Sequence, residues 1–216
     1  TYRGPGGLWN DEEVRARSHR DALADLAGLW SFFGPLRASV LAAAPTRAHR
    51  AIVAMKEKHP ALAVTIVTQN VDGLHQRAVG PADISVVELH GSLLRSRCTA
   101  CDRPAYADVV GHVAPPRCDR CGAGIRPDVV LFEEPLGVDE ERAVKRALAD
   151  CDLFLAVGTS GSVWPASSFV RSAEYAGART HFVNLEAMAV PNPYFHATHL
   201  GPADEVLPVL LGVASE

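Results

Sequence analysis

Short, almost continuous apolar runs alternate along this chain with longer stretches in which apolar residues recur every three or four positions. The runs predict strands buried on both faces, and the periodic stretches predict amphipathic helices. The predicted strands cover residues 62–67, 84–89, 128–132, 153–160 and 180–186. The predicted helices cover residues 11–33, 46–59, 139–150, 165–178 and 203–212. This alternation predicts an α/β fold built on a doubly wound, Rossmann-like parallel sheet.

Two local signals mark helix ends in the first part of the chain. The pair Gly34-Pro35 is expected to end the first helix, because proline lacks the backbone N–H that a helix interior needs. Thr46 stands directly before the second helix and is the expected N-cap.

Residues 95–126 differ from the rest, with cysteines, prolines and charges and little apolar periodicity. We expect them to form a small module inserted into a larger domain made of residues 1–94 and 127–216.

Four cysteines of this module stand in two Cys-x-x-Cys pairs, Cys98 with Cys101 and Cys118 with Cys121. Sixteen residues separate the pairs, as in zinc ribbons. Four thiolates complete a tetrahedron around one Zn²⁺ and leave no position for water or substrate, so the zinc is expected to be structural.

Composition limits the function classes. The net charge is −4, which gives no reason to expect nucleic-acid binding. The apolar runs are too short to span a bilayer, and no secretory signal is visible. Paired metal-type cysteines favour an intracellular site over a disulfide framework, so we expect a cytoplasmic protein without a membrane partner.

Polar residues and glycines gather where the predicted strands end. They are Gln69, Asn70, Asp72, His90, Gly158, Thr159, Ser160, Asn184 and Glu186. Ligands of parallel sheets bind beside these ends, so we expect one shared crevice, although strand ends also meet solvent and are polar for that reason. His90 lies only eight residues before Cys98, but four thiolates already complete the metal site. The imidazole is therefore available for proton transfer.

The motifs TQNVDGLH, ELHG, the four cysteines, GTSGSVWPA and NLE occur here in one order, and together they resemble the sirtuins, NAD-dependent protein deacylases. The resemblance covers nearly the whole chain and points to the bacterial and mitochondrial deacylase branch. It implies that an acyl-lysine protein or peptide is the substrate and that NAD is consumed to give nicotinamide and O-acyl-ADP-ribose. It also implies that residues 1–94 and 127–216 bind NAD.

The resemblance assigns roles to single residues. His90 would be the general base on a ribose hydroxyl, Asp72 would bind the nicotinamide carboxamide, and Asn70 would hold the ribose or a water. The other implied cofactor contacts are Tyr2, Arg3, Gln69, Val71, Gly158, Thr159, Ser160, Asn184, Leu185, Glu186 and Ala203. Arg37 and Val163 are the implied substrate contacts.

Three departures from the family pattern bear on activity. The Gly-Ala-Gly phosphate-binding segment that precedes TYR in the family is absent, so we expect a piece of the fold to lie upstream. Glu133 stands where the family has glycine in its FGE loop, which pairs with the substrate peptide. Gly34 stands three residues before Arg37, where the deacylase branch has a tyrosine that helps grip acidic acyl groups.

Two alternatives remain beside the deacylase. One is a non-catalytic sirtuin-like module that binds zinc and NAD, which the missing segment favours and the retained QNVD and HG motifs oppose. The other is mono-ADP-ribosyl transfer to protein, which would use the same pocket and ribose chemistry.

Overall fold

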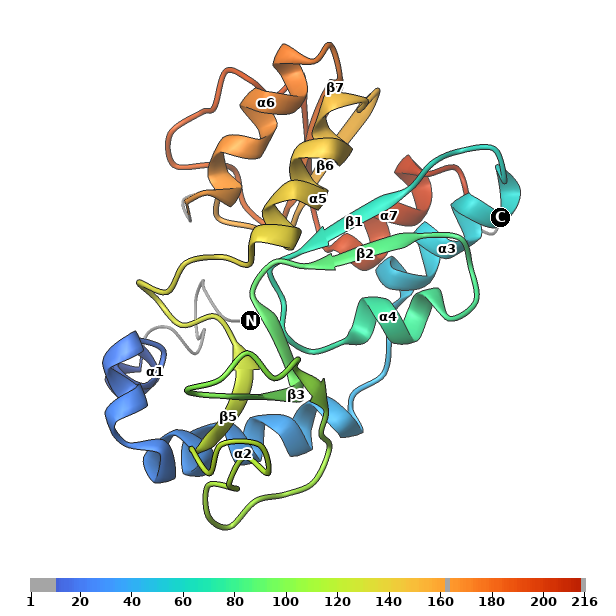
Figure 1. The fold of residues 1–216 in the computed structure, drawn as a ribbon. Coiled ribbons are helices and arrows are strands. Elements are labelled where there is room, and N and C mark those ends of the chain that lie inside the picture. Colours follow the sequence, from blue (N-terminus) through green and yellow to red (C-terminus); the bar gives the residue numbers. More distant parts are fainter. Residues whose placement is uncertain (1–10, 162–163, 215–216) are drawn as a thin grey trace. The chain divides into compact units, whose positions relative to one another are not determined.

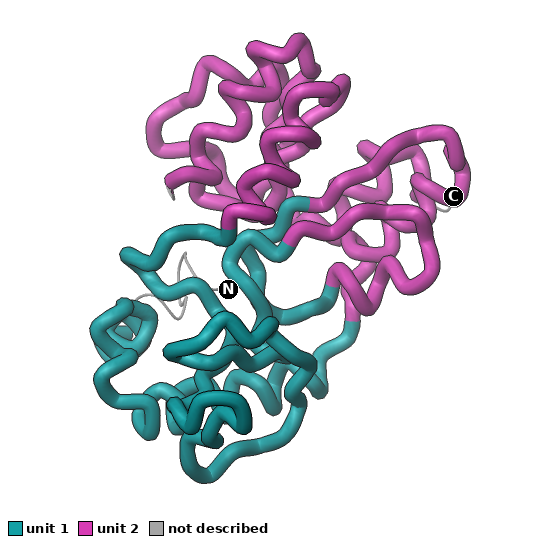
Figure 2. The backbone as a smooth tube through the Cα atoms, viewed as in Figure 1, with its two compact units in different colours: residues 1–44, 67–74, 88–137 teal, residues 45–66, 75–87, 138–216 magenta. Residues whose placement is uncertain are grey.

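The computed structural model describes residues 11–161 and 164–214, which form two compact units (Figure 2). Unit 1 takes the chain up to Ala44, together with residues 67–74 and 88–137. Unit 2 takes residues 45–66 and 75–87 and the chain from Val138 onward. The cysteine-bearing segment thus shares unit 1 with the first helices, whereas the domain boundaries at 94/95 and 126/127 stay a prediction.

From residue 11 onward, unit 1 contains the helical segments α1 (Glu12–Arg17), η2 (Arg20–Ala24) and α2 (Leu26–Ala42) (Figure 1). The prediction of one helix ending at Gly34-Pro35 is wrong. Helix α2 runs through Pro35. Pro35 lies on the exposed side of α2, so the backbone carbonyl that its missing N–H leaves unpaired can meet water.

The sheet of unit 1 has the order β4-β3-β5, with β3 (Gly91–Cys98) paired antiparallel to β4 (Tyr106–Ala107) and β5 (Ile125–Val129). Its helices cover an apolar core made of Ala22, Leu29, Phe33, Leu93, Val129 and Leu131. The strand predicted at 128–132 therefore begins earlier and ends at Val129.

Unit 2 contains the parallel sheet β6-β7-β8, made of β6 (Leu153–Val157), β7 (Arg179–Asn184) and β8 (Ala197–Leu200). Phe182 and Val183 are neighbours on β7, point to opposite faces, and are both buried. Both faces of β7 are thus covered, as predicted for a doubly wound sheet. Leu153 of β6 is 53% exposed, however, so this strand is less buried than its apolar sequence predicts.

Unit 2 also contains the helical segments α3 (Arg47–Lys58), α5 (Val138–Ala149), η3 (Ala166–Ser168), α6 (Phe169–Tyr175) and α7 (Ala203–Leu210), and most of α4 (Leu74–Val79). Helix α6 packs against β6 and β7, and α7 packs against β7 and α3. Thr46 is the N-cap of α3, as predicted, and its backbone N–H donates to Nδ1 of His49 at 3.2 Å.

The strands β1 (Thr65–Thr68) and β2 (Ser85–Glu88) pair with each other, and α4 (Leu74–Val79) lies between them in the chain. The N–H of Ser85 donates to the carbonyl of Val64, and the N–H of Leu89 donates to that of Thr68. Both partners advance by four residues in the same direction, so the pair is parallel. It brings the residues after Thr68 beside those after Glu88.

Among residues 11–161 and 164–214, no single helix is long and apolar enough to cross a membrane. Only the consecutive helices α2 and α3, taken together across the bend between them, reach the required length and apolar character.

Candidate functional site

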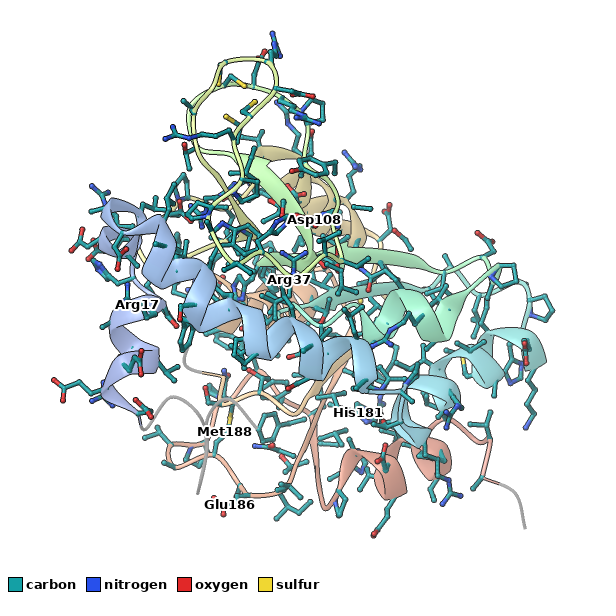
Figure 3. All side chains as sticks on the ribbon, turned by 90° about the horizontal axis from the view of Figure 1, so that it is seen from below. Arg17, Arg37, Asp108, His181, Glu186 and Met188 are labelled. Carbon is teal, nitrogen blue, oxygen red and sulfur yellow. The ribbon has the colours of Figure 1, made fainter. Side chains whose placement is uncertain are left out.

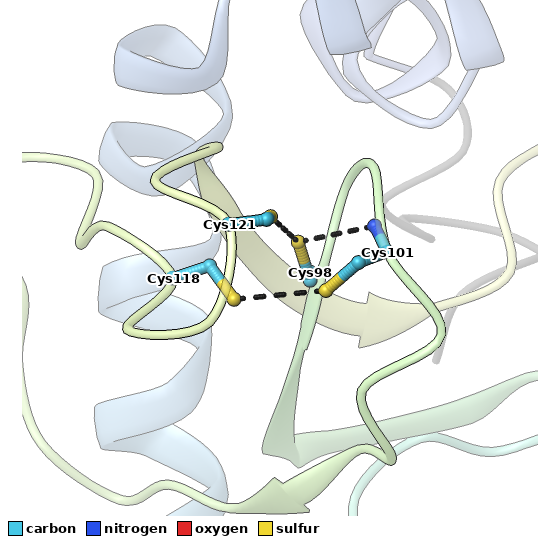
Figure 4. Close-up of side chains that lie close together, drawn as sticks. All are labelled: Cys98, Cys101, Cys118 and Cys121. Carbon is cyan, nitrogen blue, oxygen red and sulfur yellow. Dashed lines mark hydrogen bonds between the residues drawn. The ribbon is translucent and has the colours of Figure 1, made fainter.

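The four cysteine sulfurs of unit 1 lie together, all within 4.8 Å of one another (Figure 4). Cys98 Sγ is 3.5 Å from Cys121 Sγ, and Cys101 Sγ is 3.7 Å from Cys118 Sγ. Sulfurs on a tetrahedron with Zn–S bonds of about 2.3 Å are separated by about 3.8 Å. The donor set and its spacing therefore fit one structural zinc ion.

Backbone groups stabilise the thiolate of one of these cysteines. The N–H groups of Ala100 and Cys101 each donate to Cys98 Sγ at 3.4 Å. These two bonds are the main reason why the pKa of Cys98 is lowered to about 6, which favours the thiolate at this one ligand. Cys98 and Cys118 also pack against Trp30 of α2, so the cysteine segment is attached to unit 1 by apolar contact.

His90 follows β2 and precedes Gly91, the first residue of β3. Its Nδ1 lies 3.1 Å from the backbone carbonyl oxygen of Gln69. A carbonyl oxygen only accepts, so Nδ1 carries the proton, and the neutral ring keeps its lone pair on Nε2. Burial lowers the pKa of His90, against the opposing effect of the Gln69 bond. The imidazole is therefore held neutral and ready to accept a proton.

Gly91 has a reason to be glycine. Its φ is +75°, and a Cβ at this position would overlap the carbonyl oxygen of Asp128 on the neighbouring strand. The close approach of β3 and β5 thus fixes the backbone directly after His90.

The segment from Gln69 to Asp72 lies beside His90 in unit 1. The carbonyl of Val71 accepts the N–H of Leu93 at 2.8 Å, and Asp72 Oδ1 accepts the N–H of Leu74 at 2.9 Å at the start of α4. Asn70 donates its N–H to Thr68 Oγ1 at 3.1 Å, and its side chain is exposed. The structure thus brings the predicted residues 69–72 and His90 together.

A second group of predicted residues lies in unit 2, after β6 and β7. Gly158 has a φ of +62° and open space where a Cβ would stand, and Asn184 Nδ2 donates to the carbonyl of Thr159 at 3.5 Å. Ser160, Leu185 and Glu186 are exposed, and Ala203 begins α7. The shared crevice of the two groups stays a prediction. Tyr2, Arg3 and Val163 lie outside the described residues.

Arg37, the predicted substrate contact, is engaged inside unit 1. It is 3% exposed, and Nη2 lies 3.2 Å from Asp108 Oδ1 and also donates to the Asp108 carbonyl (Figure 3). Its guanidinium stands 5.0 Å from the ring centre of Trp30. Asp108 also accepts from Ser96 Oγ at 2.6 Å and contacts His112 Nε2 at 2.9 Å.

Sequence reasoning did not single out Asp108. It lies 71 residues from Arg37 and follows the two-residue strand β4, so no spacing rule connects the two. A buried, always-charged guanidinium requires a partner, but which carboxylate supplies it is decided by the fold.

Glu133 adopts a φ of +70°, which a glycine would adopt without strain. Its Oε2 lies 3.2 Å from His19 Nε2, while the adjacent Glu134 is bound by Arg126 Nη1 at 2.6 Å. Glu133, which stands where the family has glycine, and the adjacent Glu134 are thus each held by an ion pair within unit 1.

Comparison with known proteins places these features in a family. Residues 1–165 match the Sir2 family. The chain is 40% identical over 214 residues to NAD-dependent protein deacylase 2 of Pyrobaculum aerophilum, covering 98% of this chain and 83% of that protein. It is 41% identical over 217 residues to NAD-dependent protein deacylase 1 of Pseudomonas aeruginosa, covering 95% and 84%.

Solved structures agree in fold. A Sir2 homologue in complex with ADP-ribose superimposes with a TM-score of 0.87 at 32% identity, covering 99% of this chain and 84% of that one. A Sir2 homologue in complex with NAD gives a TM-score of 0.86 at 32% identity, covering 98% and 81%. A Sir2 protein bound to an acetylated peptide gives 0.79 at 25% identity, covering 92% and 84%. These structures confirm the predicted fold class.

Proposed function

This chain belongs to the Sir2 family, and on that premise we propose that it removes acyl groups from protein lysines with NAD as co-substrate. The products are nicotinamide, the free lysine and O-acyl-ADP-ribose. Relatives named NAD-dependent protein deacylase and Sir2 structures that hold NAD or acetylated peptide support this reaction class.

The observation that carries the proposal is the protonation and orientation of the His90 ring. With Nδ1 donating to Gln69, Nε2 presents its lone pair, and burial keeps the ring neutral. In the proposed role Nε2 accepts the proton of a ribose hydroxyl, so the hydroxyl oxygen becomes the nucleophile and the proton moves to the imidazole.

The neighbouring residues take binding roles in this proposal. The carboxylate of Asp72 would accept the nicotinamide carboxamide N–H, with Asn70, Gln69 and Val71 lining the same segment. In unit 2, Gly158 leaves space for close backbone approach, and the exposed carboxylate of Glu186 follows a parallel strand, where ribose hydroxyls are commonly bound. Thr159, Ser160, Asn184, Leu185 and Ala203 complete this part of the proposed NAD site. Tyr2 and Arg3, which lie outside the described residues, are further proposed cofactor contacts.

The zinc is assigned to structure and not to the reaction. Cys98, Cys101, Cys118 and Cys121 would hold it with all four positions filled by sulfur. We also propose a reducing, cytoplasmic location, because cysteines that form a metal site need to stay reduced.

Neutral acyl groups are the expected substrates. Arg37 is buried and already paired with Asp108, so its charge is compensated within unit 1. We therefore compare one peptide in its acetyl-lysine and succinyl-lysine forms, each with NAD. Nicotinamide is expected to leave NAD at least as fast with the acetyl form as with the succinyl form.

The same assay tests the proposed function. Nicotinamide release that does not depend on an acyl-lysine peptide, or ADP-ribose transferred to protein in place of deacylation, would contradict it. A strong preference for the succinyl peptide that Arg37→Met abolishes would restore Arg37 as a substrate contact.

Asp72→Asn is expected to impair nicotinamide handling more than folding. An asparagine oxygen can still accept the N–H of Leu74, so the start of α4 is retained. The charge-assisted bond to the carboxamide is lost, at a cost of about 1.5–3 kcal/mol. Turnover and nicotinamide inhibition are measured beside the melting temperature. Unchanged turnover and inhibition would remove Asp72 from the site.

A further inference from the structure

The two metal-binding turns carry the same pair of charged residues. Asp102 and Arg103 directly follow Cys101, and Asp119 and Arg120 stand between Cys118 and Cys121. Each arginine pairs with the aspartate of the other turn. Arg103 Nη1 contacts Asp119 Oδ1, and Arg120 Nη1 lies 2.8 Å from Asp102 Oδ1. The two ion pairs therefore join the turns reciprocally across the four sulfurs.

The two pairs are unequally placed. The side chain of Arg103 is 29% exposed, and its guanidinium stands 4.6 Å from the ring centre of Tyr106. The side chain of Arg120 is 59% exposed, and the aspartate is exposed in both pairs, so the difference lies in the arginines. Surface ion pairs of the second kind contribute little, because water and salt screen them and long side chains lose freedom.

Arg103 lies close to the metal ligands. The ring of Tyr106, which its guanidinium covers, packs against the apolar cluster that contains Cys98 and Cys118. Its other partner, Asp119, directly follows Cys118 in the chain. The positive charge of Arg103 is thus held beside the two cysteine turns.

The net charge of the zinc site explains why a positive charge beside it would matter. Four thiolates around Zn²⁺ carry a net charge of −2, which the surroundings must stabilise. Hydrogen bonds and charges just outside the ligands commonly set metal affinity. Arg103 combines partial burial, a position over the Tyr106 ring and an ion pair with the residue that follows Cys118.

We propose that Arg103 is a built part of the zinc site, where its guanidinium offsets thiolate charge and slows loss of the metal. Asp119 orients Arg103, while the Arg120–Asp102 pair closes the turns from outside with a smaller effect. The inference rests on the metal assignment alone and is independent of the deacylation chemistry.

The test compares zinc affinity among variants of the full protein by competition with a chromophoric chelator. Arg103→Gln is expected to weaken zinc binding about tenfold or more, within the range typical of residues that support metal ligands. Arg120→Gln is expected to weaken it less than threefold. Arg142→Gln is the matched control, since Arg142 forms an exposed pair with Asp139 on α5, at 3.4 Å.

Two further variants separate charge from pairing. Asp119→Asn keeps the charge of Arg103 and is expected to weaken zinc binding less than Arg103→Gln does. Arg103→Lys, which keeps a charge without the planar fork, is expected to fall between wild type and Arg103→Gln. It also keeps the test decisive if Arg103→Gln does not fold. An Arg103→Gln affinity equal to that of Arg142→Gln would overturn the proposal, as would a larger loss in Asp119→Asn.

Discussion

His90→Tyr is expected to lower deacylation about a hundredfold or more, the loss typical of removing a positioned base, while fold and zinc content remain. The imidazole is held by Gln69 with Nε2 open, and a phenol at neutral pH cannot accept a proton there. The cysteine site shares no ligand with His90, so metal content should equal that of wild type. Deacylation rate, zinc content and melting temperature are the measurements.

His59→Tyr is the matched control, because His59 is an exposed histidine at the end of α3 and outside the proposed site. Its rates should equal those of wild type. Nicotinamide exchange is expected to survive in part in His90→Tyr, because the base acts after the glycosidic bond breaks. Normal deacylation by His90→Tyr would refute the assignment of His90 as the general base. Loss of zinc from this variant would indicate that His90 is a metal ligand.

The pH dependence of wild-type activity is an independent test of His90 as the general base. A general base is active when unprotonated, and burial lowers the pKa of His90. Activity should therefore persist as the pH falls to the ordinary histidine value of about 6.5 and decline only below it. A decline that begins above pH 6.5 and is absent from His90→Tyr would contradict the lowered pKa.

Cys118→Ala is expected to remove the zinc and to unfold or aggregate the cysteine segment. Metal binding contributes roughly 10 kcal/mol or more to folding in comparable sites, and the segment has only a small core with Trp30 to replace it. Metal content and the melting temperature are measured together, and Cys151→Ala, which changes a cysteine outside the cluster, is the control. Complete loss of metal with an unchanged melting temperature and unchanged activity would show that the site has no structural role.

Local sequence signals predicted part of this fold well. Thr46 caps α3 because a cap is decided by residues within one turn, and the paired cysteines converge because each Cys-x-x-Cys turn places two sulfurs together. The segments after β1 and β2 meet beside His90 because those strands are parallel neighbours. In each case the signal lies within a few residues or follows from a simple topology.

Other features depend on contacts that the sequence does not reveal. Pro35 is tolerated within α2 because Trp30, Phe33 and Arg37 anchor the buried side of the helix while Pro35 faces outward. Strand β8 has only four residues, which alternate between half-buried and exposed, and this is too little to predict it. The partner of Arg37 is set by tertiary packing, so the sequence does not reveal that Arg37 is buried and paired with Asp108.

The close approach of β3 and β5 at Gly91 has a consequence for how this protein can evolve. Any other residue would need the left-handed backbone and would push β3 away from Asp128, shifting the imidazole of His90 with it. Selection on the base therefore acts on its glycine too. Descendants of this gene that keep the chemistry are expected to inherit positions 90 and 91 as one unit, and a lineage that loses the glycine should soon be free to lose the histidine.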